Sequence, residues 1–233
     1  MISCVIPAYN EERWLPATLD ALAAALRDLD EASEVIVVDD ASTDRTAAIA
    51  AAHGACVVSV SHRQIAATRN AGARMARGDR LAFIDADTLV DADVLRAALA
   101  AMRGGAIGGG AGVRFDGEVP RYARVLLPVL VRAFRALHLA AGCFVFCTKG
   151  AFDAAGGFDE RLYAAEELAL SRALKRQGPF VVLREAVKTS GRKLRTHSAR
   201  DILRMLLGVA LRGRGALASR NGLELWYDGR RDG

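Results

Sequence analysis

Short apolar runs alternate with longer amphipathic stretches along the first half of the chain. Apolar runs of about four to eight residues that end at turn residues are typical of buried strands. The pattern predicts strands at Ile2 to Ile6, Glu34 to Val38, Cys56 to Val60 and Arg80 to Ile84. The first strand is expected to end at Pro7, because proline has no backbone N–H to donate.

Between these strands, apolar residues recur at helical spacing. Helices are predicted over Glu11 to Asp28 with Asn10 as the cap, from Ser42 or Thr43 to about His53, and over Gln64 to Arg77. Strands that alternate with helices indicate a mainly parallel sheet covered by helices on both faces. Ligands of such sheets bind beyond the carboxyl ends of the strands, so the residues that follow each strand are candidates for function.

The second half of the chain has a less regular pattern. Helices are predicted at Asp91 to Met102 and Leu168 to Gln177, and a strand at Gly142 to Cys147. The stretch Gly104 to Gly112 is typical of a loop or of the approach to a strand. Tyr122 to His138 is apolar with interspersed arginines, which favours a helix that lies on a surface.

Composition narrows the class of protein. A chain of 233 residues suits one domain with an extension, and 52% hydrophobic residues exclude wholesale disorder. The net charge of +5 favours anionic partners, without choosing among nucleotide, lipid head group, membrane surface and nucleic acid. The four cysteines lack zinc-site spacing, so they are expected to be buried free thiols in a reducing compartment.

The sequence predicts a cytoplasmic protein. Met1 leads directly into an apolar run without a basic segment, and no stretch of about 18 apolar residues follows. Asp201 to Arg220 contains ILRMLLGVAL between basic residues, which suits a helix on the inner face of a membrane. The same helix could pack on the domain or on a second subunit, so peripheral membrane contact and a homodimer are both left open.

Three acidic groups follow predicted strands or loops: Asp39-Asp40, Asp85-Ala86-Asp87 and Glu166-Glu167. Two carboxylates so close to a buried strand are costly unless a cation neutralises them. We therefore expect Asp85 and Asp87 to bind Mn²⁺ or Mg²⁺, which would also hold a diphosphate. Asp87 counts as catalytic, because such an ion offsets charge on the leaving group. Helix capping or a solvated turn is the alternative.

Four segments resemble family 2 glycosyltransferases of the GT-A fold. They are VIPAYNEE (5–12), VVDDASTD (37–44), RNAGARMARGDRLAFIDADT (69–88) and AAGGFDERLYAAEELALSRALKRQG (154–178). The resemblance implies an α/β protein with a Rossmann-like mixed sheet sandwiched between helices. We expect a domain at 1–196, with a nucleotide-binding half at 1–88 and an acceptor half at 89–196. A basic helical extension at 197–233 would follow.

The resemblance also implies a donor site. Tyr9 would stack on the base, Glu11 would accept ribose hydroxyls, and Asp39 would bond the base edge. Arg69 would contact the base or a phosphate, and Arg192, in the basic loop Thr189 to Lys193, would close over the diphosphate. The implied donor-binding residues are Pro7, Ala8, Tyr9, Glu11, Asp39, Asp40, Arg69, Asp85, Ala86 and Arg192. Packing, capping and solvated surface positions are the alternatives.

Glu166 and Glu167 match the family's Glu-Asp pair near an acceptor helix, from which a general base is drawn. A carboxylate beside a second carboxylate can have its pKa raised toward that task. Glu167 stands where Asp is usual and Ala165 where Gly is frequent, so the sequence leaves open which glutamate takes the proton. Solvated charges at a helix start are the alternative.

The sequence thus predicts an inverting, metal-dependent transfer of a sugar from a UDP- or GDP-sugar. The acceptor would be a hydroxyl or a lipid phosphate, and nucleic acid is not expected as a partner. One alternative is a nucleotidyltransferase that makes nucleotide-sugars, which would normally carry a glycine-rich loop where Pro7-Ala8-Tyr9-Asn10 stand. Another is a non-catalytic scaffold that binds sugar nucleotides or a membrane surface.

Overall fold

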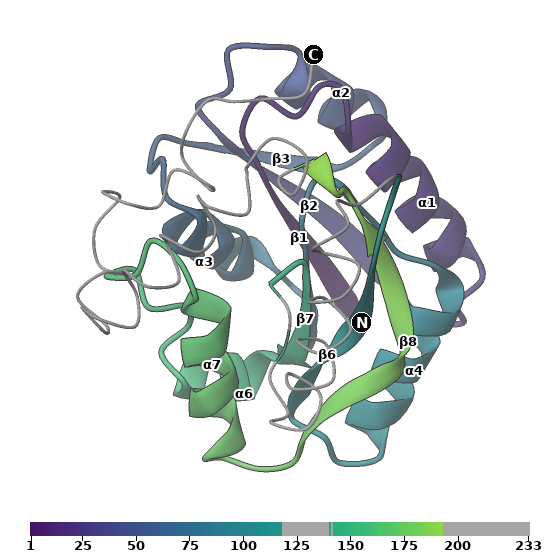
Figure 1. Cartoon of the computed structure of the whole chain (residues 1–233), viewed down its shortest axis with the longest axis vertical. Helices are drawn as coiled ribbons and strands as arrows, with labels where there is room; N and C mark the ends of the chain where they lie inside the picture. Colours follow the sequence, from purple (N-terminus) through teal and green to yellow (C-terminus); the bar gives the residue numbers. More distant parts are fainter. Residues whose placement is uncertain (118–139, 141, 193–233) are drawn as a thin grey trace.

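The computed structural model describes residues 1–117, 140 and 142–192. In this part of the chain, helices cover both faces of one eight-stranded sheet of order β3-β2-β1-β4-β7-β6-β8-β5 (Figure 1). The strands are β1 (Ile2–Ala8), β2 (Ser33–Asp40), β3 (Cys56–Val60), β4 (Arg80–Ile84), β5 (Thr88–Leu89), β6 (Gly108–Phe115), β7 (Phe144–Thr148) and β8 (Phe180–Thr189). The helices are α1 (Leu15–Arg27), α2 (Thr46–Ala52), α3 (Ile65–Met75), α4 (Ala92–Arg103), α6 (Lys149–Ala154) and α7 (Glu166–Lys175).

The sheet is mixed, as predicted. Strands β3, β2, β1 and β4 run parallel to one another, so their carboxyl ends meet at one edge. Strand β7 is antiparallel to both β4 and β6, whereas β6 and β8 are parallel. The α/β fold with a sheet between helices is confirmed, and the loops at the carboxyl edge are where a ligand is expected.

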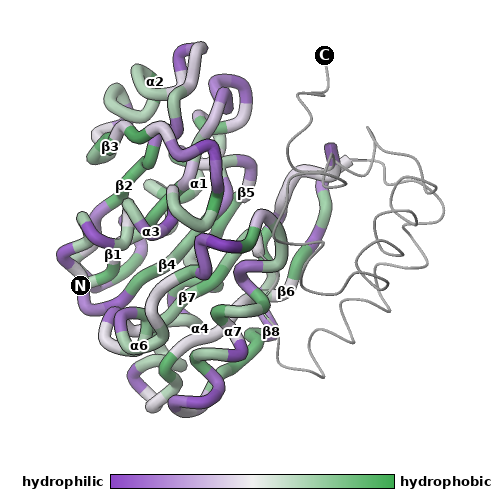
Figure 2. The backbone as a smooth tube through the Cα atoms, turned by 90° about the vertical axis from the view of Figure 1, so that its left-hand side faces the viewer, coloured by the Kyte–Doolittle hydropathy of each residue, from purple (hydrophilic) through white to green (hydrophobic). Residues whose placement is uncertain are grey.

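Each face of the sheet packs against its own set of helices. Successive side chains of a strand point to opposite faces, and along β1 Cys4 and Ile6 join a core with α1 and α4. Val5 joins a second core with α3, α6 and α7. Figure 2 shows the strands as largely hydrophobic segments between more hydrophilic loops. Because β1 is apolar on both sides, its sequence is a continuous apolar run rather than an alternating one.

Helix α3 lies unusually close to the sheet. A Cβ atom added at Gly72 would overlap with Cγ1 of Val5 and would lie 2.8 Å from Cγ2 of Val38. No side chain fits in that space, so glycine allows the helix to rest directly on β1 and β2. This close approach brings the first half of α3, which includes Arg69, to the carboxyl edge of the sheet.

The first strand and the first helix differ from the prediction. Strand β1 continues through Pro7 to Ala8, which pair with Val38 and Asp39 on β2. Pairing with β4 ends at Val5, so the missing N–H of Pro7 costs no hydrogen bond to β4. Asn10 does not cap a helix: α1 begins at Leu15, and Asn10 has a φ of 51°.

Both early helices begin later than predicted, because Asn10 and Ser42 bind backbone groups of each other's loop instead of capping the helices that follow them. The Asn10 side-chain oxygen accepts a hydrogen bond from the Thr43 N–H at 2.7 Å. Helix α2 begins at Thr46 rather than at Ser42 or Thr43, and the Asp44 carboxylate accepts from the Thr46 N–H at 2.9 Å. The loops after β1 and β2 are thereby joined at the carboxyl edge.

Strand β8 was not predicted, yet it determines how the site closes. It lies between β6 and β5, and its end pairs with β5 through Thr189 and Thr88. The hydroxyl groups of these two threonines are 2.9 Å apart in a buried hydrogen bond. Since β5 directly follows the Asp85 to Asp87 loop, this pairing delivers the end of β8 and Arg192 to that loop.

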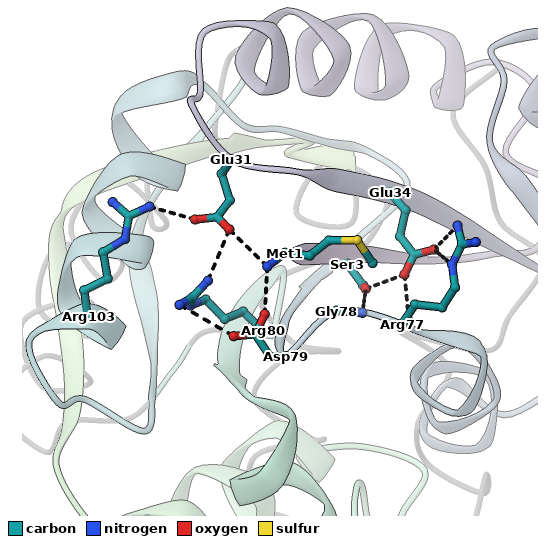
Figure 3. A network of polar contacts seen from close by, with 9 residues as sticks. All are labelled: Met1, Ser3, Glu31, Glu34, Arg77, Gly78, Asp79, Arg80 and Arg103. Atoms are coloured by element: carbon teal, nitrogen blue, oxygen red, sulfur yellow. Dashed lines mark hydrogen bonds and ion pairs between the residues drawn. The ribbon is translucent and has the colours of Figure 1, made fainter.

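An ion-pair network holds the opposite edge of the sheet, at the amino ends of β1 and β4 (Figure 3). The Glu31 carboxylate binds Arg80, Arg103 and the amino group of Met1 at 2.7 to 3.3 Å. The Glu34 carboxylate binds Arg77 and the Ser3 hydroxyl. Partly exposed pairs of this kind contribute about 0–1 kcal/mol each. The network therefore acts mainly by fixing how the strands begin.

The cysteines follow the prediction only in part. All four are free, and Cys4 and Cys147 are buried, as expected. Cys56 is exposed, which contradicts the expectation of four buried thiols. It opens β3, which is an edge strand of the sheet that the described residues form.

Several predictions concern residues outside the described part of the chain. They are the Tyr122 to His138 helix, the Asp201 to Arg220 helix and the extension at 197–233. The domain boundary, the homodimer and the membrane contact therefore stay predictions. Among the helices that the structure describes, none has the length and apolar character needed to span a bilayer.

Candidate active site

The loop with Asp85 and Asp87 follows β4 at the carboxyl edge of the sheet. Three hydrogen bonds fix its backbone. The Asp85 N–H donates to the Cys143 carbonyl at 3.2 Å, and the Ala86 carbonyl accepts from the Thr18 hydroxyl at 2.8 Å. The Asp87 carbonyl accepts from the Ser190 N–H at 3.2 Å. Hydrogen bonds from α1 and from the segments around β7 and β8 thus fix the backbone that carries the two carboxylates.

Arg192 joins Asp87 to Glu11. Its guanidinium group donates two hydrogen bonds to the Glu11 carboxylate, at 2.7 and 2.9 Å. One of the same nitrogens lies 3.1 Å from the Asp87 carboxylate. The structure thereby brings together three predicted donor-site residues that are up to 181 positions apart in the sequence. Bidentate pairing of this kind fixes the plane of the guanidinium group.

The loop that carries Arg192 is anchored by its own backbone. The Gly191 N–H donates to the Asp116 carboxylate at 2.7 Å, and the guanidinium carbon of Arg192 lies 5.7 Å from the centre of the Trp14 ring. Neither Asp116 nor Trp14 was singled out from the sequence. Nothing in the spacing of these residues shows that they meet. Asp116 reaches Gly191 because β6, which ends at Phe115, pairs with the end of β8.

Arg69 forms the second cationic bridge. Its side chain is 1% exposed, and it donates to Asp85 at 2.7 Å, to Glu166 at 2.8 Å and to the Gly142 carbonyl at 2.9 Å. Burial alone would lower the pKa of Arg69, but the charges of Asp85 and Glu166 outweigh it and leave the pKa raised. Arg69 therefore stays a cation between the two acidic sites.

Glu166 and Glu167 form the first turn of α7, two residues earlier than the predicted start of that helix. Glu166 is buried and held by Arg69, whereas Glu167 is half-buried. Burial, and then the charge of Glu166, raise the pKa of Glu167 to about 8. A Cβ atom at Gly142 would lie 3.2 Å from the carboxyl carbon of Glu167, so that glycine makes room for the carboxyl group.

Asp39 and Asp40 have different surroundings. Asp40 accepts hydrogen bonds from the N–H groups of His62, Arg63 and Gln64 at 2.6 to 3.1 Å, and from the Thr68 hydroxyl. Asp40 therefore stabilises the backbone just before α3. Such a capping role was the alternative to its predicted place in the donor site. Asp39 accepts from the Ser42 N–H at 3.3 Å and lies at the carboxyl end of β2.

The remaining predicted donor residues lie along the same edge. The guanidinium group of Arg63 covers a face of the Tyr9 ring, with its carbon 3.6 Å from the ring centre. Pro7 and Ala8 belong to β1 and are buried, so the expectation that they stand in a loop is wrong. Ala86 is buried as well and serves through its carbonyl group.

Two residues that the sequence did not single out bind backbone groups of the loop at 158–162, which precedes α7 and is called here the acceptor-side loop. The Asn70 amide donates to the Phe158 carbonyl and accepts from the Phe158 N–H, both at 2.9 Å. The Gln64 amide donates to the Leu162 carbonyl at 3.0 Å. Gly157 has a φ of 72°, a left-handed conformation that glycine adopts readily in turns. The sequence offered one indication that Asn70 belongs to the site, which is its position directly after Arg69 in the segment 69–88.

The cluster carries an excess of negative charge. In the described part of the chain, the carboxylates of Glu11, Asp85, Asp87 and Glu166 outnumber the two guanidinium groups that pair with them, those of Arg69 and Arg192. Among the described residues, no group of three or more His, Cys, Asp or Glu side chains forms a ready metal site. Mg²⁺-type ions are commonly held by one or two carboxylates together with substrate phosphates. The carboxylates of Asp85 and Asp87 suit that mode of metal binding.

Comparison with solved structures supports the fold. The UDP complex of S. aureus TarS superposes with a TM-score of 0.65 at 19% identity, over 91% of this chain and 65% of that one. Glucosyl-3-phosphoglycerate synthase of Mycobacterium tuberculosis, in complex with Mn²⁺, UDP and glucosyl-3-phosphoglycerate, has a TM-score of 0.62 at 21% identity. That match covers 93% of this chain and 80% of the other. The arrangement of the sheet and helices is that of GT-A glycosyltransferases, as predicted.

Sequence comparison gives the family. An undecaprenyl-phosphate 4-deoxy-4-formamido-L-arabinose transferase of Pseudomonas paraeruginosa is 43% identical over 95 residues, which are 37% of this chain and 28% of the relative. The chain spans less than half the length of the curated relatives that it matches. The model of the family "Glycosyl transferase family 2" matches residues 3–152, which is more than half of the chain. The chain therefore belongs to glycosyl transferase family 2.

Proposed function

We propose that the chain is an inverting, metal-dependent glycosyltransferase that moves a sugar from a UDP- or GDP-sugar to an acceptor. The observation that carries the proposal is one edge of the sheet where the Asp85–Asp87 loop, Arg192 and the glutamates of α7 converge. Family membership and the named ligands of the structural neighbours, UDP and Mn²⁺, support it. The alternatives were a nucleotidyltransferase and a non-catalytic scaffold, and family membership favours neither.

The donor end of the site would use Asp85, Asp87, Glu11 and Arg192. Asp85 and Asp87 would hold Mn²⁺ or Mg²⁺, which when bound supplies positive charge against the leaving diphosphate. Glu11 would accept the ribose hydroxyls once Arg192 turns from it to the diphosphate. Arginine suits this exchange, because its planar group binds carboxylate and phosphate in the same bidentate manner.

Glu167 is our candidate for the general base. Arg69 already binds the Glu166 carboxylate at 2.8 Å, so that carboxylate is engaged in a buried ion pair. Glu167 carries the raised pKa that a base working near neutral pH needs. The acceptor oxygen would bond to the anomeric carbon as the bond from that carbon to the diphosphate oxygen breaks, and the hydroxyl proton would pass to Glu167. Direct attack of this kind inverts the anomeric centre.

A hydroxyl acceptor needs such a base, whereas a phosphate acceptor does not, because its oxygen is already ionised. The described part of the acceptor side therefore favours a hydroxyl. A lipid phosphate is the second candidate, favoured by the undecaprenyl-phosphate transferase among the relatives.

The test is the melting temperature of the chain with UDP or GDP, each with and without MnCl₂. A ligand that binds only the folded state raises the melting temperature. We expect one of the two nucleotides to raise it by several degrees only when Mn²⁺ is present, and Asp87→Ala to abolish that shift.

The matched control is Asp93→Ala, on the exposed side of α4, which should keep the shift. If Mn²⁺ changes the affinity for neither nucleotide, the metal-dependent mechanism is wrong. Formation of nucleotide-sugar from UTP or GTP and a sugar 1-phosphate, with release of pyrophosphate, would instead establish a nucleotidyltransferase. Nucleotide binding without any turnover of UDP- or GDP-sugars in the presence of acceptors would favour the scaffold.

A further inference from the structure

Arg69 connects segments that are far apart in the sequence. It lies on α3, and its three hydrogen-bond acceptors come from the loop after β4, from the approach to β7 and from the start of α7. One acceptor is Asp85 at the donor end, and another is Glu166 at the acceptor end. A single rigid side chain thus spans the two ends of the proposed reaction.

The surroundings of Arg69 leave little room for a ligand contact. The side chain is 1% exposed, both terminal nitrogens already donate to protein oxygens, and the Phe158 ring lies 5.2 Å from the guanidinium carbon. A phosphate or base could reach this group only by displacing a buried carboxylate. Nε of Arg69 is buried and has no hydrogen-bond partner among the described residues. The terminal contacts therefore determine how the side chain is placed.

The charge of Arg69 also affects Glu167, which is next to its ion-pair partner Glu166. Burial and the charge of Glu166 raise the pKa of Glu167, and the charge of Arg69 opposes them. Removal of Arg69 would leave Glu166 and Glu167 with no neighbouring cation among the described residues of their immediate surroundings. Removal of one partner of a buried ion pair is far more disruptive than loss of an exposed one.

We infer that Arg69 is a positioning residue that ties the donor carboxylate Asp85 to the start of α7, and that it does not contact the nucleotide. The roles of donor and acceptor ends rest on the function proposed above. The inference replaces the base or phosphate contact expected from the sequence. It also agrees with the presence of an arginine, because its planar fork presents separate terminal nitrogens to Asp85 and Glu166.

The experiment compares Arg69→Lys, Arg69→Met and the control Arg74→Met, an exposed position on the same helix. The first readout needs no ligand: the titration of Glu167, followed by NMR of ¹³C-labelled glutamate carboxyl groups and assigned with Glu167→Gln. We expect the midpoint to rise by at least about one pH unit in Arg69→Met and to stay unchanged in Arg74→Met.

The second readout is the affinity for UDP and GDP with MnCl₂, measured by calorimetry. Arg69→Lys keeps the charge but cannot reach all three acceptors. We expect its dissociation constant to stay within about threefold of wild type, whereas loss of a direct charged phosphate contact costs roughly tenfold or more. Should Arg69→Met fail to fold, Arg69→Met/Glu166→Gln is compared with Glu166→Gln alone, and the same rise in the Glu167 midpoint is expected.

Two results would overturn the inference. One is a loss of more than about tenfold in nucleotide affinity in Arg69→Lys, and the other is an unchanged Glu167 titration in Arg69→Met. Failure of the proposed function looks different, because the wild-type chain would then bind neither UDP nor GDP. The titration of Glu167 would still decide whether Arg69 acts on the start of α7.

Discussion

Ala165 precedes α7 with a φ of 60° and a ψ of 22°, a left-handed conformation that costs a non-glycine residue about 1–2 kcal/mol. Glycine adopts it freely but loses about 0.5–1 kcal/mol more backbone entropy on folding. We therefore expect Ala165→Gly to raise the free energy of unfolding by about 0.5–1 kcal/mol, measured by urea denaturation. The sequence had marked this position as one where glycine is frequent in the family.

The matched control is Ala169→Gly, inside α7, which should lower the free energy of unfolding by about 1 kcal/mol. Equal destabilisation by both substitutions would contradict the left-handed conformation of Ala165.

Glu167 makes stability depend on pH. Its pKa is raised from 4.5 to about 8 in the folded chain, so between these values the folded state holds a proton that the unfolded state has lost. The stability contributed by this group is complete below pH 4.5 and is lost as the pH rises through 8. Glu167→Gln removes that dependence. We expect the variant to exceed wild type by on the order of 2 kcal/mol at pH 9.

Urea denaturation at pH 5, 7 and 9 measures this difference, which should be smallest at pH 5. If the two proteins keep a constant difference in free energy of unfolding across this range, Glu167 does not carry the raised pKa.

At the scale of elements, α3 depends on a carboxylate from another element. Asp40, at the end of β2, accepts three backbone N–H groups ahead of α3. Asp40→Ala leaves these donors unpaired, and we expect it to lower the free energy of unfolding by about 1–3 kcal/mol. Hydrogen exchange of the amides of His62, Arg63 and Gln64 should accelerate selectively. Uniform acceleration over the whole chain, with these amides no different from the rest, would argue against a local capping role.

The strands of the nucleotide-binding half could be predicted because β1, β2 and β4 are buried on both faces and appear as apolar runs. The matching ends of β4 have this origin, whereas the near match of α4 reflects apolar residues at helical spacing. The helix starts were less accurate, because Asn10 and Ser42 bind across loops rather than cap the helices that follow them. Strand β8 was missed, since charged residues such as Arg184 and Lys188 interrupt its apolar pattern.

The site could be predicted residue by residue but not as a network. Spacing and resemblance identified Asp85, Asp87, Glu166 and Glu167, all of which lie at the carboxyl edge. No local pattern indicates that Arg69 is buried between two of them, or that Asn70 holds the acceptor-side loop. Such contacts depend on how α3 and α7 pack, which is a property of the assembled sheet.

At the scale of the whole molecule, Arg192 joins the last described segment to the first loop. Because it pairs with Asp87, it competes with a metal ion for that carboxylate when no nucleotide is present. We expect Arg192→Ala to bind Mn²⁺ alone more tightly than wild type, as measured by electron paramagnetic resonance. The same variant should bind UDP or GDP with Mn²⁺ about 10- to 100-fold more weakly, because it lacks a charged phosphate contact.

Arg184→Ala, an exposed position of β8, is the control and should behave as wild type in both measurements. Wild-type affinity of Arg192→Ala for both nucleotides would show that Arg192 leaves the diphosphate untouched.

The position of β8 between β6 and β5 has a consequence for synthesis on the ribosome. Both neighbours emerge first, and each exposes an unpaired edge until the residues of β8 follow them. A nascent chain that ends before β8 already contains the acidic loop Asp85 to Asp87. It lacks Arg192, whose positive charge pairs with Asp87 in the complete fold. Assembly of the donor end is therefore a late event of biogenesis, and the growing polypeptide cannot close it from its amino-terminal half alone.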